Sequence, residues 1–379
     1  MFVPRRLGLD RILASHSVLL LGPRRTGKSS LIRNALSANR TYNLLFADVF
    51  QRLSRRPSLI REELRPGDRL VVIDEIQKLP VLMDEVHAMI EEHGVRFLLT
   101  GSSARKLRRT HTGLMAGRAR TRHLWPFVSS ELADFDLARA LSTGLLPPVW
   151  LAEDPWDELG SYVGEYLAEE IRAEALARNL PAFSRFLHTA ALTNADLVSF
   201  ESVARDAQVP PRTVREYYHV LSDTLIAEQV EPLRTGRKAV SHAKVYFFDI
   251  GVVNRLVGRH SVPEGTDEYG KAFEWLVFHE LRTWRDSSGI DLPIRFWRTH
   301  DSQEVDFVLG DDVAVEVKAT QLADDKHTRG LLALDRDAPM RRLILVTRDP
   351  ARRALGRVEV WPWRELFEAI WAGELMGAP

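Results

Sequence analysis

The stretch GPRRTGKSS, residues 22–30, decides the fold of the N-terminal part of this chain. It follows an apolar run at 17–21 that has the pattern of a buried strand, and it precedes a helical pattern at 29–36. Strand, glycine-rich loop and helix in this order are typical of a loop whose backbone N–H groups bind phosphate next to a helix N-terminus. We therefore expect the loop to bind ATP. The residues expected to contact the nucleotide are Gly22, Arg24, Arg25, Thr26, Gly27, Lys28, Ser29 and Ser30.

Two side chains of this loop and two downstream acids have predicted chemical roles. Lys28 is expected to reach the β- and γ-phosphates, and the Ser29 hydroxyl to bind Mg²⁺. A second apolar strand at 70–73 is followed by Asp74 and Glu75. Ligands bind at the carboxyl ends of parallel strands, so Asp74 is expected to hold the Mg²⁺ shell. Glu75 is expected to act as base for the attacking water, or to position it.

Two further residues are candidates for catalysis of ATP hydrolysis. Ser102 follows the apolar strand at 95–100 and is predicted to contact the γ-phosphate or its water, to cap a helix at 103–108, or both. Arg118 is the candidate for an arginine that stabilises transition-state charge in a neighbouring subunit. That role requires a homo-oligomer.

The composition is ordinary for a cytoplasmic protein of two or three domains. The chain has no cysteine, which excludes disulfides, thiolate metal sites and cysteine nucleophiles. No apolar run approaches the roughly 18 residues of a membrane span. The N-terminus lacks the apolar core of a signal peptide, so we expect a cytoplasmic location and no membrane partner.

Charge is distributed unevenly along the chain. Residues 1–130 contain 23 Lys+Arg and 11 Asp+Glu, although the net charge of the whole chain is zero. Much of the basic excess lies at 52–56 and 105–122. Such a cluster beside an ATP site is compatible with contacts to nucleic-acid phosphates. A solvated face, or a contact with the acidic remainder of the chain, explains it equally well.

Residues 203–221 have the pattern of a helix–turn–helix. Val203, Ala204 and Ala207 would face apolar residues of a second helix, and two prolines at 210–211 separate the helices. A hairpin wing is expected around 228–248. Arg212 and Arg215 would point outward toward DNA. The same unit also serves as a spacer that touches no DNA, and both interpretations remain open.

A second candidate centre lies near the C-terminus. Residues 304–309 and 313–318 are predicted to form a hairpin whose three-residue loop pairs 309 with 313. That register places Asp306 opposite Glu316, with Lys318 on the same face. Facing carboxylates repel each other, and a divalent cation with oxygen ligands would neutralise them. Glu274, on an amphipathic helix at 270–281, is expected to complete this metal site. Structural carboxylates on a solvated strand face are the alternative.

The motifs taken together resemble a family of bacterial and archaeal AAA-type ATPases. Members join an ATPase domain, a winged-helix segment and a C-terminal domain of unknown function with a PD-(D/E)XK-nuclease-like core. The matching strings are GPRRTGKSS (22–30), VVIDEIQKLP (71–80), LLTGSSARKL (98–107), LMAGRARTRHLWPFVSSEL (114–132), KVYFFDIGVVNRL (244–256), YGKAFEWLVFHEL (269–281), FWRTHDSQEVDFVL (296–309) and AVEVKAT (314–320).

The resemblance implies a role for each candidate residue. Lys28, Ser29, Asp74 and Glu75 match the ATP and Mg²⁺ positions. Ser102 matches the sensor position, and Arg118 an arginine-finger-like one. The nuclease-like positions are Glu274, Asp306, Glu316 and Lys318.

The expected fold is α/β in three parts. They are a P-loop ATPase domain of ASCE/AAA type with a parallel sheet (1–140), a helical and winged-helix segment (141–240), and a restriction-endonuclease-like domain (241–379). The leading hypothesis is an ATP-hydrolysing enzyme that acts on nucleic acid, DNA rather than RNA, through a Mg²⁺-dependent nuclease domain. The alternative is a nucleotide-controlled switch or adaptor whose C-terminal domain binds nucleic acid or protein without cleaving it.

Overall fold

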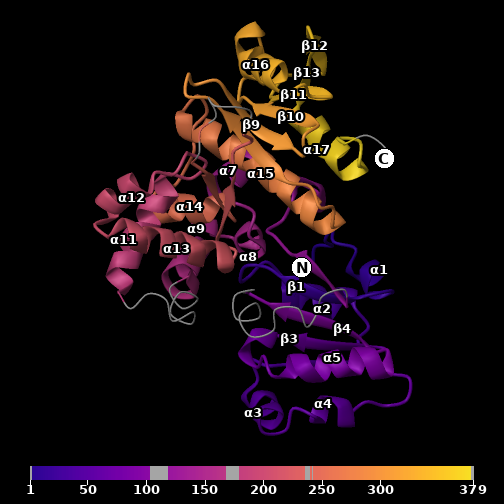
Figure 1. Ribbon diagram of the computed structural model, residues 1–379. Helices are drawn as coiled ribbons and strands as arrows, with labels where there is room; N and C mark the ends of the chain where they lie inside the picture. Colours follow the sequence, from indigo (N-terminus) through magenta and orange to yellow (C-terminus); the bar gives the residue numbers. More distant parts are fainter. Residues whose placement is uncertain (1, 103–117, 168–178, 235–239, 241, 377–379) are drawn as a thin grey trace. The chain divides into compact units, whose positions relative to one another are not determined.

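The computed structural model describes residues 2–102, 118–167, 179–234, 240 and 242–376 (Figure 1). The chain forms two compact units. The first comprises Met1–Trp125 with Asp223–Leu225 and Asp286–Gly289, and the second comprises Pro126–Ser222, Ile226–Arg285 and Ile290–Pro379.

The first unit is built on a five-stranded parallel sheet in the order β2-β3-β4-β1-β5. Its strands are β1 (Ser17–Leu21), β2 (Arg40–Asn43), β3 (Leu70–Asp74), β4 (Arg96–Gly101) and β5 (Ala119–His123). Its helices are α1 (Leu9–Leu13), α2 (Lys28–Ala35), α3 (Ala47–Arg55), α4 (Leu59–Glu62) and α5 (Leu82–His93). The predicted parallel α/β organisation of the N-terminal part is therefore confirmed.

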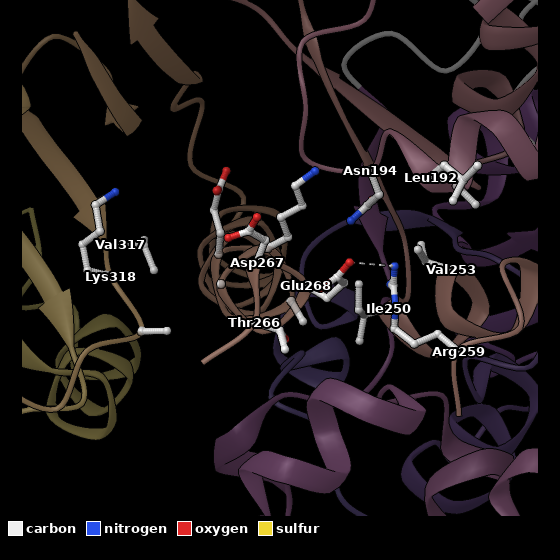
Figure 2. Close-up of a pocket in the computed structure, with 16 residues that line it drawn as sticks. Leu192, Asn194, Ile250, Val253, Arg259, Thr266, Asp267, Glu268, Val317 and Lys318 are labelled. Carbon is white, nitrogen blue, oxygen red and sulfur yellow. Dashed lines mark ion pairs between the residues drawn. The ribbon is translucent and has the colours of Figure 1, made fainter. Parts of the chain in front are cut away.

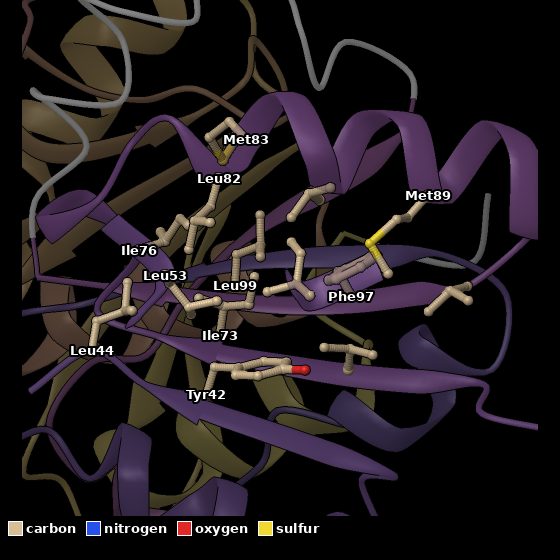
Figure 3. Packing of buried hydrophobic residues seen from close by; sticks show 14 of the residues in the cluster. Tyr42, Leu44, Leu53, Ile73, Ile76, Leu82, Met83, Met89, Phe97 and Leu99 are labelled. Carbon is tan, nitrogen blue, oxygen red and sulfur yellow. The ribbon is translucent and has the colours of Figure 1, made fainter. Parts of the chain in front are cut away.

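Helix α5 covers one face of this sheet, as Figure 3 shows. Its Leu82, Met83 and Met89 pack with Ile73 and Leu99 of the two adjacent strands, and all five side chains are at most 2% exposed. A parallel sheet covered by helices buries its central strands completely, which explains why the sequence shows continuous apolar runs there instead of alternation. This core fixes the carboxyl ends of β3 and β4 beside each other.

Strand β2 is shorter than predicted. The apolar run at 42–47 suggested a strand of that length, but the strand ends at Asn43 and α3 begins at Ala47. Leu44 is buried, whereas Leu45 and Phe46 are 59% and 60% exposed. The Asn43 side chain accepts a hydrogen bond from the Leu45 N–H, which turns the chain away from the sheet.

The helices of the second unit lie both before and among its strands. They are α7 (Leu137–Thr143), α8 (Pro147–Leu151), α9 (Pro155–Ser161), α11 (Leu180–Leu192), α12 (Phe200–Ala207), α13 (Pro211–Asp223), α14 (Ile250–Leu256), α15 (Asp267–Ser288), α16 (Arg329–Asp337) and α17 (Trp363–Ala372). The apolar residues predicted to face each other at 203–221 are buried, and Phe186 of α11 packs edge-on against Tyr218 of α13 at 5.0 Å.

A six-stranded mixed sheet organises the C-terminal part of this unit, in the order β12-β13-β11-β10-β9-β8. Its strands are β8 (Ile294–Arg298), β9 (Glu304–Leu309), β10 (Val313–Val317), β11 (Arg342–Thr347), β12 (Arg353–Leu355) and β13 (Val358–Pro362). The predicted hairpin register is confirmed for three pairs, from Leu309 opposite Val313 to Phe307 opposite Val315. The short strand β12 was not predicted, because its three residues alternate too briefly to give a pattern.

A two-stranded antiparallel sheet, β6 (Ala227–Val230) with β7 (Lys244–Phe247), lies beside the outer edge of β8. Backbone hydrogen bonds join the two: Leu233 N–H donates to Phe296 O at 2.6 Å, and Phe296 N–H donates to Glu231 O at 3.3 Å. The hairpin expected around 228–248 is therefore present as β6 and β7. It brings the first residue of β7, Lys244, toward β9.

Helices α7 and α14 meet at a contact that two glycines make possible. A Cβ on Gly251 would lie 2.0 Å from the carbonyl oxygen of Thr143, and one on Gly144 would lie 2.1 Å from the Asp249 carboxylate. Asp249 caps α14 by accepting the Val252 N–H, and it also accepts the Leu145 N–H at 2.7 Å. Because this carboxyl is buried, its pKa is raised to about 6.

Within the described ranges, no helix combines the length and the apolar character that a membrane crossing requires.

Candidate nucleotide site and a buried acidic cluster

The loop at 22–30 joins β1 to α2 at the carboxyl edge of the parallel sheet. Arg25 and Gly27 have left-handed backbone angles, with φ of 65° and 95°. Such turns direct successive N–H groups into one concavity, and this geometry suits an anion. Gly22 has no room for a side chain, because a Cβ there would lie 2.3 Å from the Leu124 carbonyl oxygen.

Lys28 is the first residue of α2, and its side chain is buried across the loop. Its Nζ donates to the carbonyl oxygens of Gly22 at 2.6 Å and Pro23 at 2.9 Å. The Thr26 hydroxyl also donates to the Pro23 carbonyl at 3.0 Å. The ammonium is thus held inside the concavity, where it would exchange these carbonyls for phosphate oxygens.

The residues predicted to hold Mg²⁺ lie together. The Ser29 hydroxyl donates to Asp74 Oδ2 at 3.2 Å, and the Thr100 hydroxyl donates to Asp74 Oδ1. Asp74 is only 3% exposed at the end of β3. A hydroxyl and a carboxylate of this kind are the oxygen donors that Mg²⁺ uses together with phosphates and water. The donor set therefore fits the ion that a bound nucleotide would bring.

Glu75, like Arg25, has a left-handed backbone conformation. Its φ of 63° is uncommon for a residue with a side chain, and such strain occurs preferentially at functional positions. Gln77 Nε2 donates to Glu75 Oε2 at 2.5 Å and to the Ser102 hydroxyl at 3.2 Å. Burial raises the pKa of Glu75 above its ordinary value, while Lys28 acts in the opposite direction. Glu75, Gln77 and Ser102 thus form one hydrogen-bonded group beside the loop.

Arg118 lies away from this group in the same chain. It immediately precedes β5, whose first residue pairs with Ser17 at the amino end of β1. The phosphate loop follows the other end of β1, about 13 Å along the strand at 3.3 Å per residue. Arg118 forms an ion pair with Glu91 at 2.5 Å. A role in a neighbouring subunit stays a prediction.

The basic residues of the interval 105–109 lie outside the described residues, as does the helix predicted at 103–108. Arg212 and Arg215 of α13 are exposed, with side chains 92% and 60% accessible. Each is near a carboxylate: Arg212 is 3.5 Å from Glu216, and Arg215 is 3.9 Å from Glu201. Exposed pairs of this length are weak, so the arginines remain available to another anion.

The C-terminal candidate residues surround a lysine that the sequence analysis did not single out. Lys244 Nζ lies 3.0 Å from Glu274, 2.7 Å from Glu304 and 3.6 Å from Asp306. Its side chain is 3% exposed. Burial alone would lower the pKa of Lys244, but Glu274 and the neighbouring acids hold it above its ordinary value. Three carboxylates within 3.6 Å of Nζ thus favour the charged ammonium.

Asp306 and Glu316 are near each other at the end of the hairpin ladder. Asp306 Oδ2 accepts the Val317 N–H at 2.8 Å, and Lys318 forms an ion pair with Glu316 at 2.5 Å. Glu316 Oε2 is buried and has no hydrogen-bond partner. Burial, and then the Asp306 carboxylate, raise the pKa of both Glu316 and Glu274.

This arrangement does not fit the predicted metal site. In the part of the chain that the structure describes, no three acidic or histidine side chains are arranged to hold a metal ion. Glu274 and Asp306 converge on Lys244, while Glu316 pairs with Lys318. Two ammonium groups lie beside these acids instead: Lys244 among Glu274, Glu304 and Asp306, and Lys318 against Glu316.

A pocket of about 540 Å³ opens beside this cluster. Figure 2 shows Val317 and Lys318 on one side, the start of α15 in the middle, and Val253 and Arg259 on the other side. Glu274 also lines it, so the acidic cluster can be reached from the pocket. Arg259 and Glu268 form a long ion pair of 4.0 Å across its wall.

Four residues that were not predicted connect the predicted ones. Gln77 and Thr100 hold Glu75 and Asp74, and Lys244 and Glu304 complete the acidic cluster. One signal was available: Glu304 lies two residues before Asp306, so both belong to one face of a strand. Lys244 gave no such signal, because its partners are at least 30 residues away.

Three sequence families match consecutive parts of the chain. Residues 14–133 match an AAA domain. Residues 134–262 and 269–366 match two domains of unknown function, DUF8612 and DUF4143. The AAA match supports an N-terminal ATPase domain of AAA type.

Two relatives with similar sequences come from mycobacteria. The chain is 25% identical over 317 residues to uncharacterized protein Mb2031c of Mycobacterium bovis and to uncharacterized protein Rv2008c of Mycobacterium tuberculosis. The match covers 80% of this chain and 70% of each relative. Among solved structures, Drosophila ORC bound to AT-rich DNA and Cdc6 matches with 8% identity and a TM-score of 0.24. That match covers 66% of this chain and 88% of the other.

Proposed function

We propose that the chain binds ATP with Mg²⁺ and hydrolyses it at the loop of residues 22–30. The observation that carries this proposal is the convergence of Ser29, Asp74 and Thr100 at the carboxyl edge of a parallel sheet. The match of residues 14–133 to an AAA domain supports it. The remaining loop residues would bind phosphate through their N–H groups, Lys28 would neutralise phosphate charge, and Glu75 would activate or orient the attacking water.

Purified protein with Mg²⁺ and ATP tests this proposal through the rate of phosphate release. Lys28→Ala should weaken nucleotide binding, measured with a fluorescent ATP analogue, because it removes the cation inside the loop. Exposed Lys78 provides a matched control, since Lys78→Ala removes an equal charge outside the loop. A Lys28→Ala protein that binds and hydrolyses ATP like the wild type would refute the proposed site.

We also propose that α11, α12, α13 and the hairpin β6–β7 form a winged-helix unit that engages DNA. Three packed helices followed by an antiparallel strand pair support this assignment. The outward-facing Arg212 and Arg215 are the groups that would contact phosphates. Fluorescence anisotropy with duplex DNA, single-stranded DNA and RNA would test the preference. If the protein binds none of the three nucleic acids, the unit is a spacer.

We propose that the C-terminal domain binds nucleic acid or protein without cleaving it. The whole chain would then be a nucleotide-controlled switch or adaptor. A nuclease-like fold with catalytic Glu274, Asp306, Glu316 and Lys318 is the competing proposal. The contacts of Lys244 favour the first, because the carboxylates already have a cation. Incubation of the pure protein with several DNA structures and Mg²⁺ or Mn²⁺ distinguishes them. Cleavage that Asp306→Ala abolishes would establish the nuclease instead.

The assembly and organisation of the chain complete the proposal. We propose a homo-oligomer in the cytoplasm, with Arg118 of one subunit near the nucleotide of the next. We propose three parts that meet near residues 140 and 240; the second of these positions lies between the paired strands β6 and β7, so the hairpin joins the middle part to the C-terminal part. Light scattering with and without ATP tests the assembly. An Arg118→Ala protein that assembles and turns over ATP like the wild type would remove this arginine from the mechanism.

A further inference from the structure

The acidic cluster of Glu274, Glu304, Asp306 and Glu316 is drawn from three separate elements. Glu274 comes from α15, Glu304 and Asp306 from β9, and Glu316 from β10. Lys244, the first residue of β7, enters from a fourth element and contacts three of these acids within 3.6 Å. Its ammonium also lies 5.6 Å from the centre of the Phe296 ring.

We propose that the ammonium of Lys244 is the resident cation of this cluster, in place of a divalent metal, and that removing it creates a divalent-cation site. The inference rests on the proposed non-cleaving function of the C-terminal domain and gives that function a physical cause. Lys244 thereby becomes the residue that determines whether this nuclease-like arrangement can hold a metal.

Donors of the chain occupy oxygens of Glu274, Glu304 and Asp306 that a metal would need. Glu274 Oε1 accepts the Tyr246 hydroxyl at 2.5 Å in addition to Lys244. Glu304 Oε2 accepts Arg298 at 2.9 Å, and Asp306 Oδ2 accepts the Val317 N–H at 2.8 Å. Mg²⁺ requires oxygen ligands at about 2.0–2.1 Å in near-octahedral geometry. These carboxylates instead have the spacing of hydrogen bonds to an ammonium.

Electrostatics makes the lysine and the metal alternatives. A divalent cation among the same carboxylates would lie a few ångströms from a buried ammonium, where water screens their repulsion poorly. The Lys244 side chain is only 3% accessible, so it does not extend into solvent away from these acids. While it stays among the acids, it opposes metal binding.

Glu316 Oε2 indicates what the cluster would do without the lysine. It is a buried oxygen with no hydrogen-bond partner, close enough to Asp306 for the two charges to influence each other. Loss of the ammonium would leave Glu274, Glu304 and Asp306 facing one another with this free oxygen nearby. Three converging carboxylates with a fourth beside them supply the oxygen ligands that a hard divalent ion takes.

Electron paramagnetic resonance of Mn²⁺ tests the inference on the nucleotide-free, full-length protein. Wild-type protein should bind no Mn²⁺ at the acidic cluster, so Asp306→Asn should leave its Mn²⁺ binding unchanged. Lys244→Met should gain one site per chain, at least ten-fold tighter than any wild-type binding, and Lys244→Met with Asp306→Asn should lose it. Lys271→Met is the matched control, because it removes a lysine that pairs with Asp196 in the same unit. It should behave like the wild type.

Two outcomes would overturn the inference. One is a wild-type Mn²⁺ site that disappears with Asp306→Asn, which would restore the predicted metal centre. The other is a folded Lys244→Met protein that binds no more Mn²⁺ than the wild type. Buried acids without a counter-charge can prevent folding, so Lys244→Met combined with Glu304→Gln provides a second variant with one negative charge fewer.

ATP turnover of the same samples separates this inference from the proposed ATPase function. If the wild type hydrolyses no ATP but shows the expected Mn²⁺ results, the ATPase proposal fails and the role of Lys244 stands. If ATP is hydrolysed and wild-type DNA cleavage requires Mn²⁺ and Asp306, the non-cleaving function and the inference fail together.

Discussion

Replacing Gln77 with alanine tests how the chain holds Glu75, the group proposed to activate water. Gln77 is 8% exposed, and its Nε2 joins the Glu75 carboxylate at 2.5 Å to the Ser102 hydroxyl at 3.2 Å. Neighbouring Gly101 leaves room for it, since a Cβ there would lie 2.6 Å from Gln77 Oε1. Gln77 is thus a positioning residue that acts through Glu75.

The expected loss follows from one hydrogen bond to a charged acceptor, which contributes about 1.5–3 kcal/mol. If the hydrogen bond stabilises the transition state by this full amount, Gln77→Ala should lower turnover about 10- to 150-fold. Glu75→Gln, which removes the proposed acceptor of the water's proton, should lower turnover about 10²–10³-fold. ATP affinity should change little in either variant, because neither side chain belongs to the phosphate loop.

The pH profile separates positioning from general structural damage. The Gln77 hydrogen bond lowers the pKa of Glu75, so its loss should raise that pKa and shift the rise of turnover to higher pH. Phosphate release at saturating ATP, measured at several pH values, reports both effects, with Lys78→Ala as the control from the same turn. A Gln77→Ala protein with turnover within two-fold of wild type and an unmoved pH profile would refute this reasoning.

Three further results are expected. Wild-type turnover should fall as pH decreases, with a midpoint above 4.5, because burial raises the pKa of Glu75 and only its ionised form accepts a proton. Initial rates of ATP hydrolysis measure this, and circular dichroism at each pH checks that the protein stays folded. A flat profile down to pH 4.5 contradicts the prediction. Gly251→Ala should lower the unfolding free energy in urea by about 1–3 kcal/mol or more, since its methyl would overlap a backbone carbonyl, whereas Gly270→Ala has open space and should cost nothing. Reversing the charges of Arg212 and Arg215 should weaken DNA binding and flatten its log–log salt dependence by about 0.9 per lost contact. An unchanged salt slope in the anisotropy titration would assign α13 to a spacer.

Local patterns predicted the parts of the fold that local interactions determine. The strand at 304–309 has the predicted bounds, and the hairpin register follows from a three-residue loop. The phosphate loop was recognisable because strand, glycines and helix are contiguous in sequence. Period and turn chemistry act over a few residues, so they can be read without the tertiary structure.

The features that could not be predicted from the sequence depend on contacts between distant segments. Leu44 is buried and Leu45 is exposed, yet both continue the same apolar run, and only the turn after Asn43 distinguishes them. Lys244 is the larger example. A lysine at the start of a strand is usually solvated, and its partner Glu304 is 60 residues away. The fold alone brings the two together, so the residues predicted for the metal site did not include Lys244.

The hydrogen bonds between the segment 231–233 and β8 make the C-terminal sheet dependent on chain that precedes it. Strand β8 is the last in its sheet, and an uncovered edge is a template for pairing with another molecule. Leu233 and Glu231 cover that edge at Phe296. A shortened protein beginning at residue 241 would lose this cover together with β6, the pairing partner of β7. We expect such a fragment to aggregate through β8. The C-terminal sheet therefore needs the preceding segment to stay soluble.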